Sequence, residues 1–175
     1  MREIPAGPER VARLFERHHL ALYRYLVSAT GSVSVAEDVT QEVFLRALRG
    51  LPADPAAHER AWLYTTARHL VLNRRRDLAR RGIPEVLPDL PGHAAPAADA
   101  LDLHGALDRL DPRDRDLLLM RELGGLGYEE LSRVFDLTPD AVRSRLHRLR
   151  LSLRNVLTRH WGAGTRPGET EIRHE

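Results

Sequence analysis

The segment from Thr138 to Arg154, TPDAVRSRLHRLRLSLR, constrains the fold most, because it combines a helix start, an apolar stripe and a cationic face. Thr138 suits the N-cap position and Pro139 the first helical position. Apolar residues then recur at helical spacing on one side. Between residues 141 and 160 there are six Arg and no acidic residue. A solvated helix face normally mixes both signs, so this unmixed face indicates an anionic ligand.

A short amphipathic segment precedes this helix and completes a helix-turn-helix. Residues 128–135 read YEELSRVF, and Asp136-Leu137 forms a tight turn before Thr138. In such a unit the second helix lies in the major groove of DNA. The cap, the turn, the stripe and the charge together predict a nucleic-acid-binding unit.

The other long apolar patterns also have the helical period of 3.6 residues, and no run of alternating strand residues is present. The first helix is expected over about residues 8–29 and ends at Thr30-Gly31. Ser34 is expected to cap the second helix, with Glu37 completing a capping box. A loop over residues 50–59 then leads to a third helix that is expected over residues 60–81.

Residues 82–100 contain four Pro and two Gly without any helical or strand period, which predicts a linker. We therefore expect an all-α fold of two small helical domains, residues 8–81 and 101–160, joined by this Pro/Ala-rich linker. The second domain contains the helix-turn-helix, preceded by a helix over residues 113–123. The tail after it, residues 161–175, has no apolar stripe and is expected to be disordered.

Charge is distributed in blocks that the net charge of +2 conceals. Residues 1–81 hold 14 Arg and 9 acidic residues, whereas residues 101–140 hold 5 Arg and 10 acidic residues. Such alternation predicts separate faces for separate partners.

The composition also excludes several classes of function. There is no Cys, which rules out disulfides and thiolate metal sites. The nine His are scattered without metal-ligand spacing, and no catalytic motif is present, so we expect neither an enzyme nor a cofactor. No apolar run is long enough to span a membrane, and the N-terminus lacks the core of a signal peptide. A cytoplasmic protein without membrane insertion is expected.

Three motifs, AEDVTQEVFLRAL, AWLYTTARHLVLNRRRDLARR and the helix-turn-helix, follow one another along the chain. Their order and spacing resemble the sigma-70 superfamily, specifically the two-domain extracytoplasmic-function (ECF) sigma factors of bacterial RNA polymerase. The resemblance covers roughly residues 8–81 and 101–156. It implies a factor that binds core RNA polymerase, recognises promoter DNA and directs transcription initiation. An anti-sigma factor is expected as a further partner.

The resemblance also implies a task for each motif. The first motif is similar to the family's core-polymerase-binding segment, with characteristic positions at Asp38, Gln41, Glu42, Phe44 and Arg46. The second is similar to the segment that melts the minus-10 element, a task that needs phosphate-facing Arg and aromatic stacking surfaces. Its candidate residues are Trp62, Tyr64, Arg68, His69, Asn73, Arg74, Arg75, Arg76, Arg80 and Arg81.

The recognition helix would read the minus-35 element. In the family pattern, the residues that face the bases are Arg143, Ser144, His147 and Arg148. Arg suits this task because it can form two hydrogen bonds to one guanine. Phosphate contacts are expected from Arg145, Arg150 and Arg154, since such contacts fix the protein's register without specifying sequence. The full candidate set is Thr138, Arg143, Ser144, Arg145, His147, Arg148 and Arg150, with Arg154 as a further phosphate contact.

Other interpretations of the same residues stay open at this point. Trp62 lies in line with the apolar stripe of its helix, which favours a core position over a stacking platform. A polymerase-independent helix-turn-helix regulator would explain the second domain but leave the first motif unused. A protein that only sequesters core polymerase or an anti-sigma factor is a third alternative.

Overall fold

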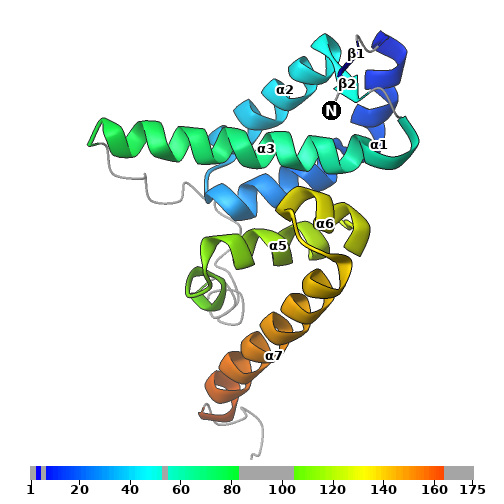
Figure 1. Ribbon diagram of the computed structural model, residues 1–175. Helices are drawn as coiled ribbons and strands as arrows, with labels where there is room; N and C mark the ends of the chain where they lie inside the picture. The colour runs from blue at the N-terminus through cyan, green and yellow to red at the C-terminus, as the bar shows by residue number, and fades with distance from the viewer. Residues whose placement is uncertain (1–2, 5–6, 53–54, 83–104, 164–175) are drawn as a thin grey trace, which may run out of the picture.

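The structure is a computed structural model that describes residues 3–4, 7–52, 55–82 and 105–163. The expected all-α fold is confirmed, and one two-residue strand ladder is added to it. The main helices of the described residues (Figure 1) are α1 (Pro8–Thr30), α2 (Val33–Arg49), α3 (Pro55–Arg80), α5 (Pro112–Glu122), α6 (Tyr128–Phe135) and α7 (Pro139–Ala163). The predicted linker lies almost wholly outside the described residues, as do residues 164–175 of the predicted tail.

Local signals explain where the first helices begin and end. Helix α1 ends as expected, because Gly31 takes the left-handed conformation with φ of 68°. The predicted cap at Ser34 is wrong: the N-cap is Ser32, whose hydroxyl oxygen accepts a hydrogen bond from the Val35 N–H at 3.4 Å. Two serines with suitable spacing competed, and the extended backbone of Ser32 decides between them. Helix α3 begins at Pro55, five residues before the expected start.

The loop before α3 contains the strand that the sequence pattern missed. Strand β2 (Leu51–Pro52) pairs antiparallel with β1 (Glu3–Ile4). Two residues are too few for an alternating pattern to be visible in a sequence. Arg10 secures this corner, since its guanidinium donates to the Pro52 carbonyl oxygen at 3.1 Å and pairs with Glu59 at 2.5 Å.

The helix-turn-helix forms where it was predicted. Asp136 takes the left-handed conformation with φ of 52° at the turn, a conformation that Asp tolerates better than most residues. Thr138 caps α7 by accepting a hydrogen bond from the Ala141 N–H at 3.2 Å. Helix α7 runs to Ala163, so residues 161–163, which were expected to belong to the disordered tail, are helical.

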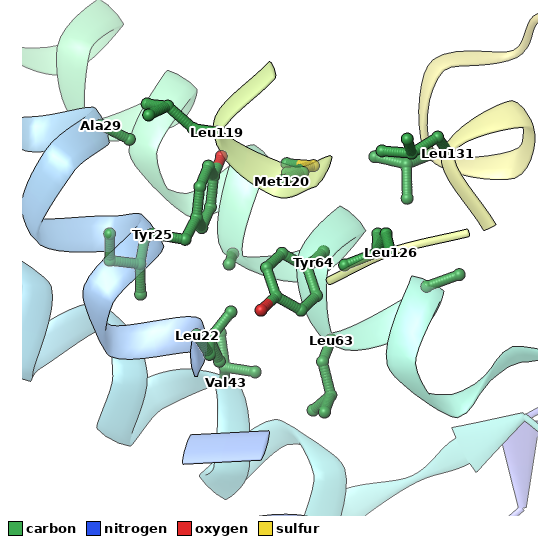
Figure 2. Packing of buried hydrophobic residues seen from close by; sticks show 14 of the residues in the cluster. Leu22, Tyr25, Ala29, Val43, Leu63, Tyr64, Leu119, Met120, Leu126 and Leu131 are labelled. Carbon is green, nitrogen blue, oxygen red and sulfur yellow. The ribbon is translucent and has the colours of Figure 1, made fainter. Parts of the chain in front are cut away.

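Helices α1, α2 and α3 form one layer, and α5 and α6 pack beneath it while α7 extends away (Figure 1). The buried residues form one continuous cluster that crosses between the two groups of helices. Figure 2 shows Tyr25 and Tyr64 beside Leu119, Met120 and Leu126. The two predicted units are therefore in direct contact.

Candidate nucleic-acid interface

The predicted base-reading residues lie on the exposed side of α7. Arg143, Ser144, His147 and Arg148 are all exposed, while Val142, Leu146 and Leu149 form the buried stripe of the same helix. Arg148 has no ion-pair or hydrogen-bond partner among the residues that the structure describes. Arg143 bonds Asp140 at 2.6 Å, and its guanidinium lies 5.4 Å from the Tyr128 ring centroid. This face is open to a ligand.

Two of the predicted phosphate contacts on α7 have acidic partners, contrary to the expectation of an unmixed cationic face. Arg145 pairs with Asp114, and Arg150 bonds Glu122 at 2.6 Å. Both acids come from α5, more than twenty residues earlier in the chain. The sequence pattern missed them because it searched only for partners within the helix. The hydrogen bond that Arg150 donates to the Glu122 carboxylate raises the pKa of Arg150 above its ordinary value.

The C-terminal half of α3 presents a second basic surface. His69, Asn73 and Arg76 are exposed on this half, and Arg80 is exposed beside Asp77. The other predicted arginines differ in their surroundings. The Arg74 guanidinium lies 3.6 Å from the Asp38 carboxylate, and Arg75 donates to the Ala29 carbonyl oxygen at 3.0 Å. Arg81 is exposed. Exposed arginines on one helix suit the backbone of a nucleic acid strand.

The N-terminal half of α3 is covered instead. Tyr64 is fully buried, with its ring centroid 5.4 Å from that of Tyr25. Arg68 bonds Asp116 at 3.1 Å and lies 5.2 Å from the ring centroid of Phe135. Trp62 is half-buried and packs against the core, in agreement with the core interpretation. None of these three side chains is presented as an open stacking surface in this arrangement.

Burial has the largest effect on the pKa values of Tyr25 and Tyr64. Burial raises the pKa of Tyr64 well above its ordinary value. It also raises the pKa of the Asp116 carboxyl, although Arg68 and the Tyr25 hydroxyl act in the opposite direction. The Tyr25 hydroxyl donates to Asp116 at 3.3 Å. The tyrosines are therefore neutral hydrogen-bonding or packing groups at any physiological pH.

The predicted polymerase-binding residues fall on two sides of α2. Asp38, Glu42 and Arg46 line a shallow hollow between α2 and α3 of about 490 Å³. Glu42 bonds Arg46 at 2.7 Å, and this hydrogen bond lowers the pKa of Glu42. Gln41 and Phe44 instead line a groove between α1 and α2. The structure thus brings this set together on one helix but not on one face.

The groove between α1 and α2, of about 530 Å³, contains residues that the sequence analysis did not select. Phe15, Leu45 and Leu48 line it and are 41–45% exposed. The Phe15 ring stacks on His19 at 4.4 Å and meets Phe44 edge-on at 5.0 Å. The sequence did contain a signal for this groove, because Leu45 is apolar but lies outside the inward-facing apolar stripe of its helix. Exposed apolar side chains gathered in one groove mark an interaction surface.

Within the described residues, no group of three or more His, Cys, Asp or Glu side chains could hold a metal ion. Within the same residues, no helix is long and apolar enough to cross a membrane.

Two family descriptions match the chain in the order of its motifs. Sigma-70 region 2 matches residues 14–81, and Sigma-70, region 4 matches residues 100–153. The first match lies within residues 8–81 and the second overlaps residues 101–160, and together they contain all candidate residues of the three motifs except Arg154.

Curated sigma factors are similar over most of the chain. ECF RNA polymerase sigma factor SigL of Mycobacterium tuberculosis is 31% identical over 158 residues, which cover 82% of this chain and 88% of SigL. RNA polymerase sigma factor YlaC of Bacillus subtilis is 28% identical, with 86% of this chain and 94% of YlaC covered. ECF RNA polymerase sigma factor SigE of Mycolicibacterium smegmatis is 30% identical over 84% of this chain, which spans only 61% of SigE.

Solved structures share the fold. CnrH, in its complex with the cytosolic domain of CnrY, is 28% identical with a TM-score of 0.63, and 87% of this chain and 91% of CnrH are covered. The sigma factor RpoE of Bartonella quintana, in complex with the anti-sigma factor NepR, has a TM-score of 0.68. That match covers 84% of this chain and 96% of RpoE at 20% identity, so it speaks for the fold alone.

Proposed function

Because this chain belongs to the ECF family of RNA polymerase sigma factors, we propose that it binds core RNA polymerase and directs initiation at promoters read by two separate helices. The observation that carries this proposal is the pair of exposed basic surfaces, on the C-terminal half of α3 and on α7. One would engage the melted minus-10 strand and the other the minus-35 duplex. A sigma factor is an initiation factor without catalytic chemistry of its own, and we place its action in the cytoplasm.

Polymerase docking is assigned to the surface of α2. The apolar groove beside Phe44 offers exposed apolar contacts, and Asp38, Glu42 and Arg46 supply charged groups on the other side of the helix. An apolar centre is typical of protein interfaces, which favours the groove as the docking site. An anti-sigma factor is proposed as a second protein partner of this chain, and the relative CnrH, which was solved with the cytosolic domain of CnrY, supports a protein partner.

A run-off transcription assay with purified core polymerase tests the proposal. We expect initiation from defined promoters only when the protein is present. Leu45→Arg, in the groove, should weaken association with core at least about tenfold, because a charge replaces an interface anchor. Leu20→Arg is the matched control, since Leu20 of α1 is 50% exposed, against 41% for Leu45, but does not line the groove. Binding to duplex DNA with no effect on polymerase would instead support a polymerase-independent regulator.

The division of α7 into base readers and phosphate contacts has its own test. Arg148→Ala should reduce discrimination between promoters by about 1–3 kcal/mol. Arg154→Ala should weaken binding evenly across promoters and lower the salt dependence. Identical behaviour of the two variants on every promoter would contradict the assignment.

A further inference from the structure

One of the predicted base-reading arginines lies over an aromatic ring of the neighbouring helix. Tyr128 is the first residue of α6, and its half-buried side chain packs against the core. The guanidinium of Arg143 of α7 lies over this ring, 5.4 Å from its centroid. A cation within about 6 Å of the centroid of a tyrosine ring is attracted by the ring face. The two helices of the helix-turn-helix are therefore joined at the surface by a cation–π contact.

The Tyr128 ring is itself held by α5. The guanidinium of Arg121 lies 4.9 Å from the same ring centroid and donates to the Leu126 carbonyl oxygen at 2.6 Å. Arg121 is half-buried, whereas Arg143 is exposed. The ring is thus fixed by the core and by an anchored cation, and it offers Arg143 a platform that does not depend on α7.

A carboxylate of α7 binds the same guanidinium. Asp140 lies three residues before Arg143 and accepts a hydrogen bond from its Nη1 at 2.6 Å. The Asp140 side chain is 87% exposed, so solvent weakens this ion pair and the pair alone restricts Arg143 little. The ring and the carboxylate together restrict the guanidinium more than either does alone.

These contacts leave the donors that a base requires. A guanidinium carries N–H groups on all of its nitrogen atoms. Within the described part of the chain, Arg143 donates only from Nη1, and its Nε and Nη2 groups have no acceptor. A pair of N–H groups is what a bidentate bond to O6 and N7 of guanine needs. Arg143 can therefore bond guanine without giving up the ring or the carboxylate.

Arg148, the other arginine among the predicted base readers, is not held in this way. It has no ion pair, hydrogen bond or cation–π contact among the residues that the structure describes. An arginine that is free before binding loses side-chain freedom when it bonds a base, whereas one that is already restricted loses less. The two arginines thus differ in how far they are arranged before DNA arrives.

We propose that Tyr128 and Asp140 are positioning residues for promoter reading: they hold the Arg143 guanidinium where it bonds one guanine of the minus-35 element. The inference rests on the proposed function, because it needs α7 to read promoter DNA. Specificity at one base pair then depends on Tyr128, which lies outside the recognition helix. Because Tyr128 acts through Arg143, its loss affects the base pair that Arg143 reads and no other.

The test uses the full chain bound to core polymerase. A fully randomised duplex library, selected for binding to the unmodified protein with core, defines the preferred promoter, and Arg143→Ala identifies the guanine that this residue reads. Competition binding then gives the affinity ratio between the preferred promoter and the same promoter with that guanine replaced. The variants are Tyr128→Leu, which removes the ring, and Tyr128→Phe, which keeps the ring and removes only the hydroxyl.

We expect Tyr128→Leu to lower this affinity ratio about threefold, the effect of losing one exposed cation–π contact. Tyr128→Phe should keep the full ratio, and both variants should keep the discrimination at the other base pairs. In an Arg143→Ala background Tyr128→Leu should have no further effect, whereas in an Arg148→Ala background its threefold effect should remain. A variant that merely loosened the fold would act in both backgrounds.

Asp140→Asn tests the second positioning residue. It should lower the ratio at the same base pair about twofold, as expected for an exposed ion pair. Glu129→Gln is the matched control, because it removes one negative charge from an exposed residue of α6 that makes no contact with Arg143, and it should leave the ratio unchanged.

Three results would overturn the positioning role. They are an unchanged ratio for Tyr128→Leu, an equal loss at every base pair, and weaker binding of Tyr128→Phe to all sequences, which would make the hydroxyl itself a DNA contact. A failure of the proposed function is distinguishable from these, because the unmodified protein with core polymerase would then select no sequence from the library.

Discussion

The two halves of helix α3 are built from similar residues but have different neighbours. The first half, residues 60–68, packs against α5 and α6 through Arg60, Tyr64 and Arg68. The second half, residues 69–80, carries exposed arginines, and its bonds to other helices run to the first unit: Arg74 lies 3.6 Å from Asp38 of α2, and Arg75 donates to the Ala29 carbonyl oxygen of α1. Arginine content alone therefore does not identify a DNA-binding surface; the partner of each guanidinium does.

The strongest test of this comparison is truncation of one side chain in each half. Tyr64→Ala should lower the free energy of unfolding by about 3–5 kcal/mol, because a fully buried aromatic side chain is lost. His69→Ala, on the exposed half, should change it by less than about 0.5 kcal/mol. Urea denaturation measures both. Similar values for the two variants would show that the halves do not differ in burial.

Gly124→Ala should be the next largest effect. A Cβ atom there would lie 2.6 Å from the Met120 carbonyl oxygen and 2.7 Å from the Tyr64 ring, and such overpacking costs about 1–3 kcal/mol. Gly105→Ala is the control, since a Cβ atom at Gly105 meets nothing within 4 Å. If the close approach of the two units is correct, part of the cost disappears in a Tyr64→Ala background, which a double-mutant cycle measures.

The exposed half is tested through its electrostatics. Arg76→Ala should reduce the salt dependence of single-strand binding by about 0.7 in the slope of log K against log salt, the value for one lost phosphate contact. Arg10→Ala is the control, because Arg10 pairs with Glu59 at the strand corner. An unchanged slope for Arg76→Ala would remove this residue from the DNA surface.

The smallest effect is expected from Tyr64→Phe. The Tyr64 hydroxyl oxygen is buried and has no hydrogen-bond partner among the described residues. Its removal should raise the free energy of unfolding by up to about 1 kcal/mol, since a buried polar group without a partner is costly. A loss of stability in the same urea titration would reveal a hydrogen bond that this packing does not contain.

Local features of the fold were predictable from sequence because their causes are local. The Gly31 stop, the Thr138 cap and the Asp136 turn each depend on a few neighbouring residues. The contact between the two helical units was not predictable, because Arg60 and Glu130 are seventy residues apart and an ion pair produces no periodic pattern in the sequence. The charge blocks were interpreted as faces for separate external partners.

In the structure those blocks also bind each other, since Asp116 and Glu130 of the acidic block hold arginines of the basic one. The choice of candidate residues in the three motifs came from the family resemblance, and their individual roles stay predictions. What the structure adds is which of them are accessible: Arg148 is, whereas Tyr64 is not.

Hydroxyl-radical footprinting of the tyrosines and Met120, read by mass spectrometry, tests the division of α3 most directly. In the free protein we predict slow oxidation of Tyr64 and Met120, which are both fully buried, and faster oxidation of the half-buried Tyr23 and Tyr128. Oxidation of Tyr64 as fast as that of Tyr23 in the free protein would contradict the account.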